Sequence, residues 1–131
     1  MRYLLVLLGG IVCGAVLAFI AANTLLQRDA YPRSVMQILQ HHVGALRQAR
    51  RRGDCGLEGL RRHWTGMANL ALEIDPAFAA RAPEPAFSET SQRFVRLMTT
   101  LAQSPPVDCA TLDHAQAQIN EACEDCHRQY R

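Results

Sequence analysis

The sequence contains no lysine: all 14 basic residues are arginines, and 12 acidic residues leave a formal net charge of only +2. A charge this small gives no strongly basic surface, which speaks against nucleic-acid binding. The 131 residues are one domain's worth of chain, and they show no internal repeat and no convincing strand pattern. No acid–base pair or nucleophile constellation stands out either, so we expect a protein that is not an enzyme.

Charged residues are also missing from a long run near the N-terminus. Residues 3–22 read YLLVLLGGIVCGAVLAFIAA, and about 20 such residues span a bilayer core as a helix. A cleaved signal peptide is the alternative, but its apolar region is usually only about 7–15 residues long and ends in an A-x-A site. This run is longer and lacks a clean site. We therefore expect residues 1–26 to form a single-pass membrane anchor and residues 27–131 to form the folded domain.

Four helices are expected after the anchor, because apolar residues recur at spacings of three and four. They cover approximately residues 32–52, 55–73, 88–103 and 109–130, with a proline-rich loop over residues 75–87. Pro32 suits the first position of the first helix, and Asp54 is the expected N-cap of the second. The pattern predicts an all-α protein, an up-down-up-down four-helix bundle preceded by one N-terminal transmembrane helix.

The most reactive residues lie at the end of the sequence, in CEDCHRQYR. Cys123, Cys126 and His127 form C-x-x-C-H, the attachment signature of c-type haem. Two thiols three residues apart lie on one face of a helix, and each can add to a vinyl group of haem. The adjacent imidazole then ligates the iron from one side. The motif predicts one covalently bound haem c.

Two other interpretations of C-x-x-C have less support. A thioredoxin-like redox motif needs a strand before its helix, and none is expected here. A zinc site needs two more ligands, and Cys55 and Cys109 could supply them only by leaving the opposite end of the bundle. Covalent haem is attached outside the bacterial cytoplasmic membrane. We therefore expect the chain in the bacterial inner membrane, with the bundle on the periplasmic side.

The remaining cysteines suggest a disulfide. Cys13 lies in the apolar run, so Cys55 and Cys109 are left over, and two leftover thiols in an oxidising compartment are candidates for pairing. Both begin a helix at the same end of the bundle. Those helices are diagonal neighbours, and a disulfide needs Cα atoms within about 7 Å. The bond can therefore form only if the two loops lean across that end.

A four-helix pattern with C-x-x-C-H near its C-terminus, followed by Tyr130 and Arg131, resembles the class II c-type cytochromes, which include cytochrome c prime and its low-spin relatives. The resemblance covers approximately residues 31–131. It implies a haem at one end of the bundle, with His127 as the proximal ligand of the iron. It also places Met36 at the distal position, although Pro32 stands where the family usually carries an arginine.

Within this resemblance, the function depends on whether Met36 ligates the iron. An antiparallel bundle brings the start of the first helix level with the end of the fourth, so Met36 lies near His127. His/Met ligation raises the reduction potential and suits electron transfer, whereas an open distal side suits a small gas such as nitric oxide. We expect Met36 to ligate the iron. We also expect Tyr130 to continue the inward face of the last helix and Arg131 to reach a haem propionate or the proximal side.

The sequence therefore predicts a membrane-anchored periplasmic c-type cytochrome that passes single electrons to a membrane-bound or periplasmic redox partner. Only about ten residues separate the anchor from the haem end, so the haem should lie near the membrane surface. Two alternatives stay open. One is a gas-binding protein in which Met36 only lines the pocket, and the other is a haem-bearing structural subunit of a respiratory or photosynthetic complex.

Overall fold

The computed structural model describes residues 2–79 and 85–130, and most of these residues are helical, with no strand among them. The helices are α1 (Arg2–Arg52), α2 (Leu57–Leu72), α3 (Ile74–Phe78), α4 (Pro85–Gln103) and α5 (Cys109–Tyr130). The chain divides into two compact units, Met1–Arg33 and Ser34–Arg131. The predicted fold class, a helical bundle with one N-terminal apolar helix, is confirmed.

The first unit is the apolar part of α1. Its segment Val6–Thr24 has a mean hydropathy of 2.3 over 19 residues and is long and apolar enough to cross a membrane. Large side chains such as Phe19 are 72% exposed there, so no protein core covers them. A membrane anchor and a signal sequence share these properties, and the N-terminal helix suits either.

Pro32 lies inside α1, so the prediction that it begins a helix was wrong. A proline inside a helix removes one backbone hydrogen bond, but the residues on both sides favour helix strongly enough to continue it. The boundary between the two compact units falls directly after this position, at Arg33. The sequence pattern had placed the boundary after residue 26.

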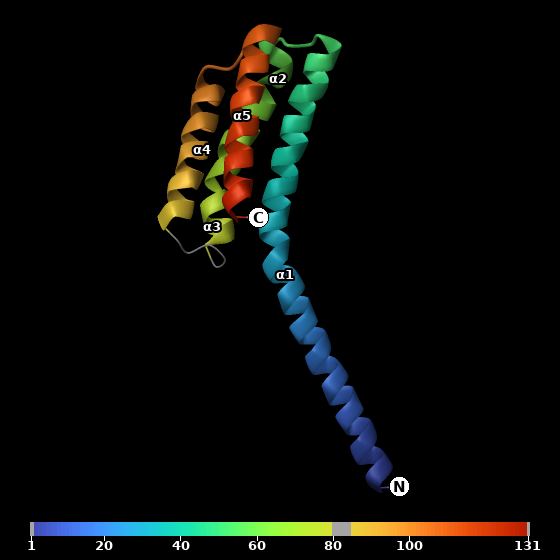
Figure 1. The fold of residues 1–131 in the computed structure, drawn as a ribbon. Coiled ribbons are helices and arrows are strands. Elements are labelled where there is room, and N and C mark those ends of the chain that lie inside the picture. The colour runs from blue at the N-terminus through green and yellow to red at the C-terminus, as the bar shows by residue number, and fades with distance from the viewer. Residues whose placement is uncertain (1, 80–84, 131) are drawn as a thin grey trace. The chain divides into compact units, whose positions relative to one another are not determined.

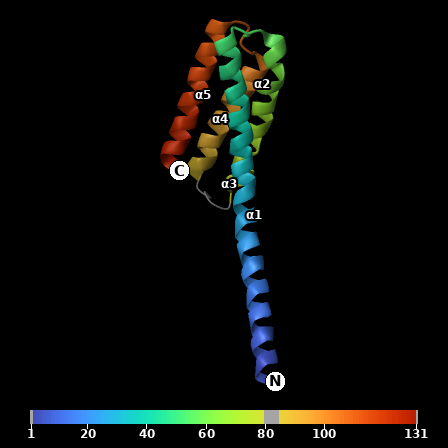
Figure 2. The same cartoon turned by 90° about the vertical axis from the view of Figure 1, so that its right-hand side faces the viewer.

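The second unit is the four-helix bundle. The part of α1 from Ser34 onward, α2, α4 and α5 run alternately up and down, and the short α3 lies between α2 and α4 (Figures 1 and 2). Helix α2 packs on α4, and α4 packs on α5. Fully buried side chains from all four helices form one core: Leu46, Trp64, Met67, Met98, Leu112 and Ile119. The amphipathic spacing in the sequence thus converges on a single interior.

Two helix starts differ from expectation. Helix α2 begins at Leu57 with Gly56 as its N-cap in extended backbone, so Asp54 is not the cap. Helix α4 begins at Pro85, and α3 occupies part of the segment that was expected to be a loop. Pro76 and Pro85 lie in the first turns of α3 and α4, where the missing N–H has no helical partner to lose.

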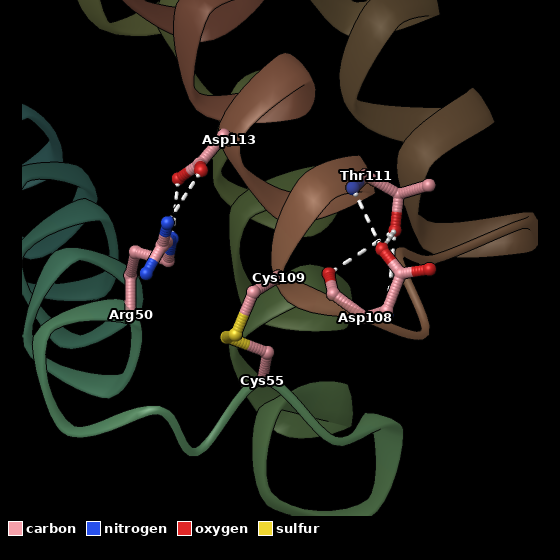
Figure 3. The surroundings of a disulfide bond; sticks show 6 residues. All are labelled: Arg50, Cys55, Asp108, Cys109, Thr111 and Asp113. Atoms are coloured by element: carbon pink, nitrogen blue, oxygen red, sulfur yellow. Dashed lines mark hydrogen bonds and ion pairs between the residues drawn. A yellow bond between two sulfur atoms is a disulfide. The ribbon is translucent and has the colours of Figure 1, made fainter.

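A disulfide joins Cys55 to Cys109 across one end of the bundle, which we call the disulfide end (Figure 3). The Cα atoms are 5.1 Å apart, because Cys55 lies in the α1–α2 connection and Cys109 is the first residue of α5. Gly53, with a φ of +77°, allows that connection to turn back directly after α1. Helices α2 and α5 are diagonal neighbours, and the loops before them lean toward each other at this end. The disulfide can therefore form here, whereas the middles of the two helices lie too far apart.

Polar contacts at the same end fix the start of α5. Asp108 accepts hydrogen bonds on its carboxylate from the backbone N–H and the hydroxyl of Thr111, at 2.8 and 2.7 Å, and the backbone N–H bond, with the hydroxyl bond next, lowers the pKa of Asp108. Arg50 of α1 forms a two-pronged ion pair with Asp113 of α5, at 2.6 and 2.8 Å (Figure 3). These contacts set the register of α1 against α5.

Candidate functional site

A cavity of about 790 Å³ opens inside the second unit. This volume lies within the range of about 300–1,000 Å³ that is usual for small-molecule and cofactor sites. Helices α1, α3, α4 and α5 all contribute to its wall. The wall includes Cys123, Cys126, His127 and Met36 together. The structure thus brings the whole C-x-x-C-H motif and the predicted distal methionine to one cavity.

The last turns of α5 hold the two thiols. Cys123 and Cys126 are free and half-buried, and their spacing of three residues places them on neighbouring positions of one helix face. Burial raises the pKa of both thiols, and the charge of Cys126 adds to the effect on Cys123. Both thiols are therefore protonated at neutral pH.

A raised thiol pKa is the opposite of what a redox-active C-x-x-C requires, because disulfide exchange uses a thiolate whose pKa is lowered. The disulfide between Cys55 and Cys109 also occupies the two thiols that a zinc site would have needed. Among the described residues, no group of three or more His, Cys, Asp or Glu side chains could hold a metal ion. Neither alternative interpretation of the motif gains support.

The α1 wall places Met36 within one helical turn of the level of His127. From the Arg50–Asp113 ion pair, Met36 and His127 each lie fourteen residues further toward the other end of the bundle. From the Arg47–Asn120 hydrogen bond, His127 is level with Gln40, four residues above Met36. One turn of helix rises about 5.4 Å, so the two residues lie at similar levels along the bundle. Met36 is half-buried and packs against the core.

The α4 wall combines apolar and polar side chains. Thr90, Ser91, Arg93, Phe94 and Leu97 line the cavity from consecutive turns of this helix. Arg93 donates from Nη2 to Oγ1 of Thr90 at 2.8 Å. Ser91 is only 3% exposed, yet its Oγ has no hydrogen-bond partner. Buried hydroxyls without a partner are uncommon, and this one is available to donate to a group in the cavity.

Tyr130 lies at the end of the bundle opposite the disulfide. It is half-buried, packs against the core, and its ring meets that of Phe87 edge to face at a centroid distance of 5.1 Å. Tyr130 thus continues the inward face of α5, as the sequence suggested. Arg131, the other predicted haem-end residue, lies outside the described residues.

Three histidines near the middle of α1 and α2 form a separate cluster. Nδ1 of His42 lies 2.9 Å from Nδ1 of His63, and the ring of His41 lies 5.6 Å from that of His42. Burial, followed by the charge of neighbouring side chains, lowers the pKa of both His42 and His63. Gly66 gives the ring of His42 its space, since a Cβ there would lie 2.8 Å from Nε2. His42 is therefore a satisfied packing residue between two helices.

Several wall residues were not predicted from the sequence, above all Ser91 and Arg93. A helical period does place Arg93 one turn before Leu97, at the edge of the inward face of α4. No motif marks either residue, however, because the α4 wall becomes part of the site only when α4 packs against α5. Comparison of the chain with protein-family profiles, curated proteins and solved structures finds no match. The interpretation of the site therefore depends on its own residues.

Proposed function

We propose that this protein is a membrane-anchored c-type cytochrome that carries single electrons through one covalently bound haem. The observation that supports this most directly is the composition of the cavity wall. Two free thiols, an imidazole and a thioether sulfur, from Cys123, Cys126, His127 and Met36, line one cavity of cofactor size. These are the four side chains that covalent attachment and His/Met ligation of haem require.

The residues of the wall fit the group in a consistent way. Cys123 and Cys126 would hold it through two thioether bonds, His127 would be the proximal ligand, and Met36 would reach the other side from α1. Bound haem supplies a one-electron iron couple, and the His/Met ligand pair raises its potential. Phe94 and Leu97 on α4 give the cavity an apolar wall that would exclude water from the ring.

The rest of the chain agrees with a position outside the cytoplasm. A disulfide persists in oxidising compartments and is rare in the cytosol, and the chain contains one at Cys55–Cys109. An apolar N-terminal helix would keep the bundle at a membrane. In this proposal the bundle is periplasmic, and its partner is a membrane-bound or periplasmic redox protein, including a respiratory or photosynthetic complex.

Haem staining of a denaturing gel tests the proposal. The full chain, produced together with a haem-attachment system in the bacterial periplasm, should give a stained band. The variants Cys123→Ala and Cys126→Ala should lose stain, because each removes one thioether. The matched control is Cys13→Ala, which removes the exposed free thiol of the apolar helix and should keep full stain. A wild-type band without colour after denaturation would refute the haem.

A further inference from the structure

On the basis of the proposed function, we infer that Arg93, positioned by Thr90 and assisted by Ser91, forms the binding site for a haem propionate. The observation behind this inference is the orphaned hydroxyl of Ser91, which lines the same cavity as Arg93 of the same helix. A carboxylate is the group that both side chains can satisfy, since a hydroxyl and a guanidinium each donate to it.

The chemistry of haem selects the α4 wall. The two vinyl-derived carbons and the two propionates occupy opposite edges of the macrocycle. Thioethers to Cys123 and Cys126 would hold the first edge at α5. With His127 and Met36 as the ligands of the iron, the propionate edge would be left to the remaining walls of the cavity. Of these, α3 contributes Ile74 and α4 contributes the polar residues.

The positions of Ser91 and Cys126 along the bundle axis agree with this assignment. The rings of Phe87 and Tyr130 are in contact, which places these two residues side by side on α4 and α5. Four residues along α4 from Phe87 comes Ser91, and four residues back along α5 from Tyr130 comes Cys126. Ser91 therefore lies across the cavity from the C-x-x-C-H motif and not above or below it.

Charge also favours α4. The cavity wall contains two arginines, Arg47 and Arg93, but Arg47 donates to Asn120 of α5 at 2.6 Å, on the thioether side. The α5 rim adds Glu121, Glu124 and Asp125, whose carboxylates would repel a propionate. Arg93 lies on α4 instead, where its hydrogen bond goes to the neutral hydroxyl of Thr90 and the acidic residue one turn before it is Glu89.

The hydrogen bonds around Arg93 prepare it for a carboxylate. Thr90 accepts one N–H of Arg93 at 2.8 Å and donates its own hydroxyl to the backbone oxygen of Ala86 at 2.9 Å. Thr90 is thereby fixed and orients the guanidinium. A guanidinium has five N–H donors, so the bond to Thr90 leaves enough of them for a two-pronged contact with one propionate.

Resonance Raman spectroscopy and redox titration of the haem-loaded full chain test the inference. Arg93→Gln should shift the propionate bending band and lower the midpoint potential, because it removes a positive charge that favours reduced iron. The visible spectrum should stay as in the wild type, since iron ligation is unchanged. Ser91→Ala should shift the same band by a smaller amount. The matched control is Arg96→Gln, since Arg96 is an exposed arginine of the same helix, as Arg93 is, but does not line the cavity; it should leave the band in place.

The outcomes separate the two proposals. A wild-type chain without covalent haem refutes the proposed function itself. A haem-loaded Arg93→Gln whose band stays in place, or whose band moves no more than that of Arg96→Gln, overturns the propionate site alone. If Arg93→Gln does not accumulate, Arg93→Lys provides the same test: it keeps the charge, so the potential should stay close to the wild type while the band still shifts.

Discussion

Removal of the Cys55–Cys109 disulfide should cost the bundle a large part of its stability. The two cysteines are 54 positions apart in the sequence. In the chain-entropy model, a cross-link that closes a loop of this size restricts the unfolded chain and stabilises the fold by roughly 4 kcal/mol at 25 °C. Domains of this size are stable by only about 5–15 kcal/mol, so the bridge would account for much of the total.

The double variant Cys55→Ser/Cys109→Ser tests this value, because it leaves no unpaired thiol at the disulfide end. Urea unfolding of the full chain in detergent, followed by the fluorescence of the buried Trp64, should show a midpoint shift equivalent to about 4 kcal/mol. Cys13→Ser serves as the control and should leave the midpoint unchanged. A loss below about 1 kcal/mol would refute the entropic reasoning and would mean that the Arg50–Asp113 pair and the cap on α5 hold this end unaided.

Three further predictions follow from particular contacts. With haem bound, Met36→Ala should convert a low-spin optical spectrum to a high-spin one; a wild-type spectrum that is already five-coordinate would instead favour the gas-binding alternative. Burial lowers the pKa of His42 and His63 below the usual 6.5, assisted by the charges of the neighbouring histidines and Arg62, so the unfolded chain takes up protons first as the pH falls. Stability should therefore decrease from pH 7 to pH 5, and His42→Gln/His63→Gln should flatten this dependence in denaturant melts. Gly66→Ala should be less stable than Gly59→Ala by about 1–3 kcal/mol, since a Cβ at Gly66 meets the His42 ring at 2.8 Å whereas one at Gly59 meets nothing within 4 Å; equal thermal melting of the two would contradict this.

The helices could be predicted where their ends carry local signals. Helix α5 begins at Cys109 because Asp108 caps it through Thr111, and both residues are visible in the sequence. Helix α2 lacks such a signal, since its N-cap is Gly56 without a side-chain hydrogen bond, and its start was misplaced. Two predictions that depended on proline were wrong, the helix start at Pro32 and the loop that includes Pro85. The effect of a proline depends on whether it lies in a first turn, as at Pro85, or inside a helix, as at Pro32.

The candidate site could be predicted only on the side that carries a motif. Spacing alone marks Cys123, Cys126 and His127, because covalent chemistry demands that order of residues. The α4 wall has no such requirement. Thr90 and Ser91 are ordinary helix residues until the contact of Phe87 with Tyr130 fixes how α4 lies against α5. Burial of an unpaired hydroxyl is a property of that packing and could not be inferred from sequence.

The links that stabilise the bundle and the cavity lie at different places along it. Covalent and ionic links, the disulfide and the Arg50–Asp113 pair, join α1, the α1–α2 connection and α5 at one end. The cavity and its thiols lie further along the same helices, where an orphaned hydroxyl shows that polar groups are not all satisfied by the protein. A bundle closed at one end can hold its helices in register while the other part keeps a cavity lined with reactive side chains. In the proposed function this arrangement would let the chain fold before attachment and present both thiols on an ordered helix to the incoming haem.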